Sequence, residues 1–201
     1  MSPIHRSAVI LFIIVSTSIF GIAQQGKKPI SLDNEDLSPY GGSTDVVNAG
    51  KVGWAQVNPE AGRFSVMMPG TVLVGQRPLS VPSVGTLTTH IYQAEDGGRE
   101  YIAYYVDYPY VLPESMIEIA YDSGRNNMLS TSNVTVLSES TIKSGEYTGR
   151  QMLVKEETHK GYLQMFLVRN RLYVLFCDNG ASDKISDDTK KFLSSFKITA
   201  E

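Results

Sequence analysis

The sequence predicts an α+β protein: an antiparallel β-sheet with one helix inserted midway and one near the C-terminus, and with both sheet faces covered by helices or by a second layer. The strongest observation is the run 161–177, whose two arms carry apolar residues on both of their faces. A strand that meets water on one face alternates apolar with polar residues, so this hairpin belongs in the middle of a sheet that is covered on both sides. Further short alternating segments predict more strands, and two segments with apolar residues three and four apart predict helices.

The strands follow one another through short turns. Turn signals stand at Pro69-Gly70, at Asp96-Gly97-Gly98 and at Asn170, because these residue types accept the backbone of tight turns. We expect Asn170 to take the left-handed conformation at the tip of the central hairpin. The expected strands, in chain order, are 63–68, 72–81, 84–94, 100–108, 133–142, 147–156, 161–168 and 172–177.

Two helices interrupt the strands. The first begins at Pro113, which suits the first turn of a helix. Its apolar stripe is Ile117, Ala120, Tyr121, Gly124 and Met128. The second helix follows the capping residues of 182–186, with Asp187 and Asp188 in its first turn. Its buried side is expected to be Ile185, Thr189, Phe192, Leu193 and Phe196.

The N-terminus divides the chain into three parts. Residues 1–23 combine Arg6, an apolar run and a small-residue end at Ala23, which predicts a secretory signal peptide. An uncleaved membrane anchor is the alternative, but the apolar run is short for a span of about 20 residues. Residues 24–53 are rich in Gly, Ser, Asp and Pro and predict a flexible leader, either a spacer or a docking tail. Residues 54–201 form the single domain of a periplasmic or extracellular protein, with no stable membrane span after cleavage.

Charge and cysteine content argue against two properties: nucleic-acid binding and disulfide or thiol chemistry. The net charge is −3 and no run of Lys and Arg occurs, which argues against a nucleic-acid partner. A single cysteine forbids an internal disulfide, and Cys177 on the central hairpin is expected to be a buried small hydrophobe rather than a reactive thiol.

Six strings occur in order along the domain: RFSVMMPGTV, VPSVGTLTTHIY, YIAYYVDYP, YTGRQMLV, FLVRNRLYVL and KKFLSSFKI. Their order and spacing resemble small exported bacterial domains of the PsbP-like kind, over residues 64–198. The resemblance implies an antiparallel sheet sandwiched by helices, similar in fold to the extrinsic photosystem II subunit. It implies no activity, because most members of that kind have no assigned biochemical role and fold alone does not fix function.

No familiar catalytic or cofactor motif is present. The chain lacks HExxH, CxxC, GxSxG, a P-loop and a dinucleotide fingerprint, so no cofactor and no metal is predicted. His159 stands beside Glu156 and Glu157, which leaves a metal site as an alternative to a solvated hairpin turn. His90 lies on a strand, where a catalytic base would also need a nucleophile and an orienting acid that the sequence does not name.

The candidate ligand-binding residues are Tyr105, Asp107, Tyr108 and Arg150. The first three lie in a tyrosine-rich strand and its exit loop, and tyrosines suit both interfaces and the rim between a sheet and a helix. Arg150 stands beside Gly149 on another strand and needs a carboxylate if it is half-buried, with Asp107 as the expected partner. Such a pair fits a structural ion pair at least as well as an anion site.

These observations support two hypotheses of function. The first is an exported, non-enzymatic binding or assembly module that contacts a protein or envelope component through its sheet edge and tyrosine-rich loop. The alternative is a small-ligand-binding or hydrolytic domain, with a site near Tyr105, Asp107 and Arg150 that includes His90. A pocket that gathers at least three of these four side chains within contact distance would favour the alternative, and finding them on opposite faces of the sheet would exclude it.

Overall fold

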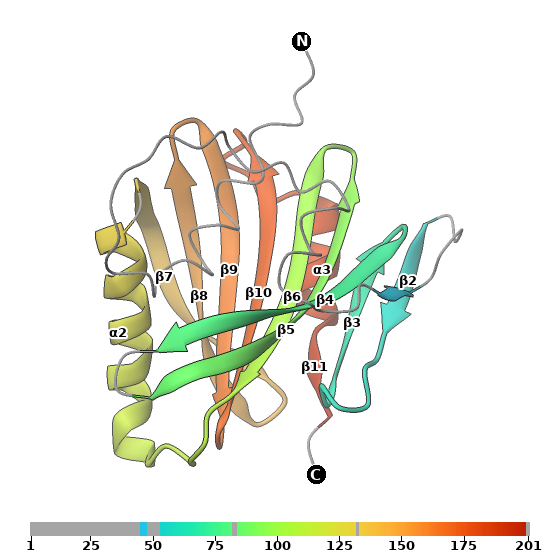
Figure 1. Ribbon diagram of the computed structural model, residues 1–201. Coiled ribbons are helices and arrows are strands. Elements are labelled where there is room, and N and C mark those ends of the chain that lie inside the picture. The colour runs from blue at the N-terminus through green and yellow to red at the C-terminus, as the bar shows by residue number, and fades with distance from the viewer. Residues whose placement is uncertain (1–44, 48–52, 82–83, 132, 200–201) are drawn as a thin grey trace, which may run out of the picture.

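The computed structural model describes residues 45–47, 53–81, 84–131 and 133–199 (Figure 1). Its main sheet has eight strands, and every neighbouring pair is antiparallel. In sheet order these are β1 (Asp45–Val47), β4 (Val72–Val81), β5 (Gly85–Asp96), β6 (Arg99–Asp107), β10 (Arg171–Gly180), β9 (His159–Val168), β8 (Tyr147–Glu156) and β7 (Val134–Ser144). A second sheet contains β11 (Lys197–Ile198), β3 (Phe64–Pro69) and β2 (Trp54–Val57). The helices are α2 (Glu114–Thr131) and α3 (Asp187–Ser195).

The described chain is therefore α+β and mostly sheet, as predicted. All eight expected strands are present, and β9 and β10 lie inside the sheet between β8 and β6. Alternate residues of this hairpin enter different cores: Tyr173 and Leu175 on one face, Val174 and Phe176 on the other. Burial on both faces is what an apolar hairpin requires.

The two faces of the main sheet are covered by different elements. One face packs on α3 and the second sheet, in a core that includes Phe64 and Phe192. The other face packs on α2 through Tyr121. Figure 1 shows α2 beside β7 and β8, and α3 with β3 at the other side of the molecule.

The tip of the central hairpin differs from the expectation. Arg169, not Asn170, has the positive φ, at 56°. Asn170 instead contacts Tyr108 twice: its side-chain Nδ2 donates to the Tyr108 carbonyl at 2.9 Å, and its backbone carbonyl accepts from the Tyr108 N–H at 2.7 Å. The tip thereby holds the end of β6.

Three short strands were not predicted from the sequence. β1 pairs with the start of β4 and lies inside the range expected to be leader, so the sheet begins upstream of Trp54. β2 and β11 pair with the two edges of β3. These strands are too short to show an alternating pattern. The predicted signal peptide, residues 1–23, lies outside the described residues.

Two local predictions are confirmed: a capping residue at the start of α3 and the burial of Cys177. Ser186 is the N-cap, and its Oγ accepts from the Thr189 N–H at 3.1 Å. Cys177 is fully buried beside the Thr189 hydroxyl, and burial raises the pKa of its thiol to about 12. The thiolate is therefore absent at neutral pH, and the residue is inert.

Candidate functional site

The four predicted site residues do not form one site. Tyr105 and Asp107 point to the face of α3 and the second sheet, whereas Arg150 points to the face of α2. Strand alternation causes this split, because Arg150 lies opposite Met165, whose side chain belongs to the α2 core. The expected pairing of Arg150 with Asp107 is therefore wrong.

Asp107 pairs with Arg171 of the neighbouring strand instead. The Nε and Nη2 of Arg171 donate to the two carboxylate oxygens of Asp107, each at 2.6 Å. Its Nη1 donates to the carbonyl of Ala61 at 2.6 Å, and its guanidinium lies 4.3 Å from the centre of the Tyr105 ring. Hydrogen bonds to Asp107 raise the pKa of Arg171. A guanidinium with these acceptors joins β6, β10 and the loop before β3, which favours a structural ion pair over an anion site.

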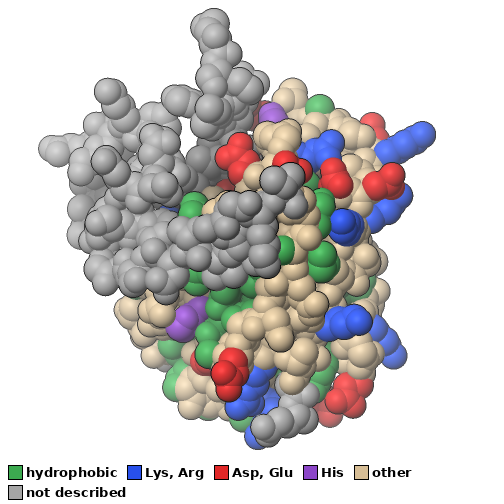
Figure 2. Space-filling view, turned by 90° about the vertical axis from the view of Figure 1, so that its right-hand side faces the viewer, with side chains coloured by type: hydrophobic (Ala, Val, Ile, Leu, Met, Phe, Trp, Pro, Cys, Tyr) green, Lys and Arg blue, Asp and Glu red, His purple; other side chains and the backbone are tan. Residues whose placement is uncertain are grey.

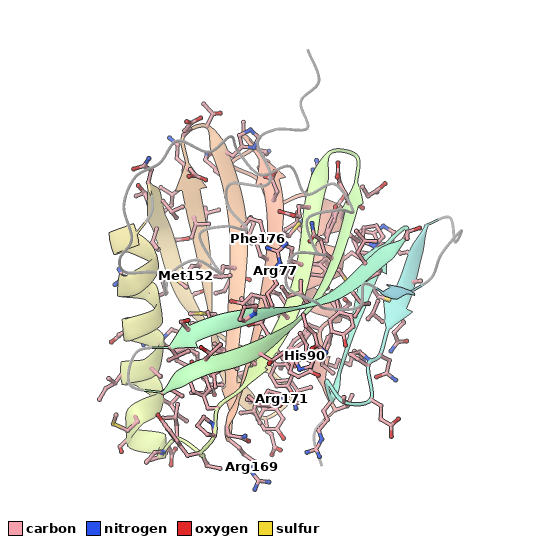
Figure 3. All side chains as sticks on the ribbon, in the orientation of Figure 1. Arg77, His90, Met152, Arg169, Arg171 and Phe176 are labelled. Carbon is pink, nitrogen blue, oxygen red and sulfur yellow. The ribbon has the colours of Figure 1, made fainter. Side chains whose placement is uncertain are left out.

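His90 lies in the same cluster, so three of the four residues of the alternative hypothesis meet around Arg171. The imidazole stacks on the Tyr105 ring at 4.6 Å, with an angle of 4° between the rings. Figure 3 shows His90 and Arg171 in the same part of the molecule, with Met152 toward α2. Burial lowers the pKa of His90, Asp107 opposes this shift and Arg171 adds to it. The histidine is therefore neutral at pH 7, and its ring packs against carbon rather than against a nucleophile.

Arg150 binds α2 to the far edge of the sheet. Its guanidinium contacts the carboxylates of Glu118 and Asp122 on α2 and of Glu139 on β7. It also lies 5.5 Å from the centre of the Tyr121 ring. These contacts indicate a structural role, because the carboxylates of α2 and β7 share one guanidinium and are held together by it.

Most of the tyrosine-rich segment fills the core. Tyr101, Tyr104 and Tyr105 are buried, and the backbone of Tyr108 is held by Asn170. Tyr110 differs, since half of its side chain is exposed. The tyrosines of the strand therefore pack in the core, and Tyr110 of the exit loop is exposed to solvent.

That loop continues into an exposed apolar surface. Tyr110 and Val111 precede α2, and Met116 and Ile119 lie one turn apart on its outer side, with exposed fractions of 42% to 54%. We call these four residues the 110–119 surface. The sequence contained a signal for it, because Met116 and Ile119 fall outside the predicted apolar stripe of the helix. An apolar residue off the stripe has no core to enter.

The charged side chains that the 109–122 segment contributes to the 110–119 surface are acidic, and one of them, Glu118, contacts Arg150 of β8. Glu114 and Glu118 lie between or beside its residues, and the sequence from Pro109 to Asp122 contains no Lys or Arg. Elsewhere the charges are mixed, and Figure 2 shows basic and acidic side chains interspersed on the face that it presents. None of the helices in the described ranges is long and apolar enough to cross a membrane.

The imidazole of His159 lies near Asp178, with 3.6 Å between its Nδ1 and the Oδ2 of the carboxylate. Asp178 is buried on β10, and with Glu100 on β6 it forms a pair of buried acidic residues that sequence analysis missed. Within the described part of the chain, no group of three or more His, Cys, Asp and Glu side chains could hold a metal ion.

No protein-family model matches the chain, and no curated protein matches it.

Proposed function

We propose that the protein is an exported, non-enzymatic module that binds another protein of the cell envelope through the 110–119 surface. The observation that carries this proposal is the exposure of four large apolar side chains on one loop and one helical turn. Exposed apolar residues that gather in this way are typical of protein contact surfaces, whereas single ones are common everywhere. In this proposal the chain is a PsbP-like domain located in the periplasm or outside the cell.

The charges define the chemistry of the proposed partner. Glu114 and Glu118 are exposed at the 110–119 surface, and the segment from Pro109 to Asp122 contains no basic residue; Arg150 of β8 contacts Glu118, so Glu114 carries most of the local negative charge. A partner with apolar side chains flanked by Lys or Arg complements both features. A second copy of this chain offers the same acidic surface and is therefore a poorer fit.

The alternative of a small-ligand or hydrolytic site has less support. His90, Tyr105 and Asp107 do lie together, but Arg171 already binds both oxygens of Asp107. Arg150, the fourth residue of that hypothesis, lies on the other face of the sheet.

Site-specific photo-cross-linking in the native host tests the proposal. A photoreactive residue at 111 or 119 is expected to give the same heterologous adduct, and one at the exposed position Asp187 on α3 is expected to give none. Met116→Glu should remove that adduct. The matched variant Leu137→Glu, at an equally exposed apolar residue of β7, should not.

The outcomes separate the proposals. An adduct only between two copies of the chain would replace the envelope partner by a homodimer. No adduct from 111 or 119, or an adduct that Leu137→Glu removes as readily as Met116→Glu, would contradict the 110–119 surface as the contact.

A further inference from the structure

Two buried carboxyl groups lie side by side on the α2 face of the sheet. Glu100 on β6 is 4% exposed and Asp178 on β10 is 2% exposed. The register pairs Tyr101 with Cys177, so the next position along both strands places Glu100 beside Asp178. Buried acidic residues are rare unless they are paired with a charge or with hydrogen-bond donors.

The two groups are satisfied to different degrees. Asp178 accepts from the Gly180 N–H at 2.7 Å and lies near His159. Glu100 accepts one hydrogen bond, from the Gln93 amide to Oε1 at 2.8 Å. Its Oε2 is buried without a hydrogen-bond partner among the described residues. A negative charge on that oxygen would be poorly compensated, whereas a protonated carboxyl group is tolerated there.

The charges that face Glu100 come from several strands. The pKa of Glu100 is raised to about 8: burial is the largest cause, Asp178 of β10 and Glu95 of β5 act in the same direction, and Arg77 of β4 acts against them. His159 of β9 lies on the other side of this pair, with its Nδ1 3.6 Å from the Asp178 carboxylate. Figure 3 shows Arg77 in the same part of the molecule as Phe176, a neighbour of Asp178 in sequence.

Glu100 also stands next to the tip of the β5–β6 hairpin. Asp96 and Arg99 form the last pair, and the turn between them has two glycines with positive φ. Arg99 reaches α3 on the other face: its Nη1 donates to the Oγ of Ser186 at 3.2 Å and lies 3.6 Å from the carboxylate of Asp188. Ser186 is the N-cap of α3, so the hairpin tip is attached to the start of that helix.

We propose that Glu100 is a pH-sensitive latch whose protonated form keeps the β5–β6 tip closed and Arg99 on the first turn of α3, and whose ionisation opens both. Opening brings the carboxylate of Glu100 into water, where it releases its proton to solvent at an ordinary pKa. The open form therefore binds the proton more weakly than the closed form, and its population rises with pH. Arg99 follows because it is the adjacent residue.

Amide hydrogen exchange measured by NMR on the whole chain tests the latch. After correction for intrinsic exchange, protection of residues 93–100 should fall roughly tenfold per pH unit between pH 5 and pH 7. Protection of the Thr189 and Lys190 amides, which donate to Ser186 at the start of α3, should fall over the same range. Glu100→Gln mimics the protonated form and should abolish both slopes, whereas the control Glu95→Gln, at an exposed neighbour, should retain them.

Each other outcome is decisive. A flat profile in the wild type, or an unchanged slope in Glu100→Gln, overturns the latch. A slope at the tip without one at Thr189 and Lys190 overturns the link through Arg99, and Arg99→Gln should produce that pattern. If Glu100→Gln does not fold, the carboxyl carbon shift of Glu100 in the wild type decides, because ionisation near the ordinary value of 4.5 overturns the proposal.

Discussion

Arg171 and Asp107 form a two-pronged ion pair across β10 and β6, with both hydrogen bonds at 2.6 Å. The pair fixes the end of the central strands, and Arg171 continues from it to the carbonyl of Ala61. Three segments far apart in sequence are thereby joined by one side chain.

Asp107→Asn should destabilise the protein by about 1–2 kcal/mol. This is less than the roughly 3–5 kcal/mol expected for a fully buried pair, because the Asp107 side chain is 45% exposed and solvent screens the charge. Urea unfolding at low and high salt measures the effect, which should shrink as salt rises. Asp96→Asn, at an exposed position of the β5–β6 tip, should change stability by less than about 0.5 kcal/mol. Equal effects of the two variants would contradict the role of the pair.

Tyr121→Phe should cost about 1–3 kcal/mol, because it leaves backbone groups unpaired. The Tyr121 hydroxyl accepts from the buried N–H of Leu167 at 2.7 Å and donates to the carbonyl of Thr148 at 3.4 Å. The hydroxyl of Tyr121 on α2 thus bridges a backbone N–H of β9 and a backbone carbonyl of β8. Tyr110→Phe removes the same hydroxyl from a half-exposed ring and should be close to neutral. Unfolding of both variants in urea provides the comparison, and a neutral Tyr121→Phe would show that water replaces the hydroxyl.

His90 should titrate below its ordinary pKa of 6.5, because burial disfavours its charged form. Its contribution to stability is therefore complete above pH 6.5 and is lost as pH falls from 6.5 through the folded-state pKa. An NMR titration of the imidazole, assigned by its absence in His90→Gln, measures this value. Asp107→Asn should lower the pKa further, since the Asp107 carboxylate favours the charged imidazole. Titration at or above 6.5 would contradict the stacked, partly buried position on Tyr105.

Local periodicity predicted the strands and helices because buried positions recur at fixed spacings along each element, and apolar residues occupy those positions. The central hairpin shows this best, since its two apolar faces required two cores. Pairings across strands were harder to predict. Arg150 and Arg171 are both strand arginines that could pair with Asp107. The strand register decides between them, because it places Arg171 opposite Asp107 and Arg150 on the other face of the sheet.

Other features leave little trace in a sequence. Glu100 and Asp178 resemble ordinary polar residues near strand ends, and their burial follows from the twist and pairing of four strands. β1 and β11 contain three and two residues, so their pairing depends on the sheet edges that receive them. By contrast, the 110–119 surface was partly predictable, because Tyr110 lay in the exit loop identified from the sequence.

Gly161→Ala should destabilise the protein by about 1–3 kcal/mol, because the position opposite Asp178 has no room for a side chain. A Cβ at 161 would collide with the ring of Phe176 and approach the carbonyl oxygen of Cys177. Phe176→Leu creates space, so the double variant should be more stable than the sum of the two single effects predicts. Chemical unfolding of the four proteins in this cycle measures the coupling. Strictly additive free energies of unfolding would mean that the backbone of β9, rather than the Phe176 ring, yields to the added methyl group.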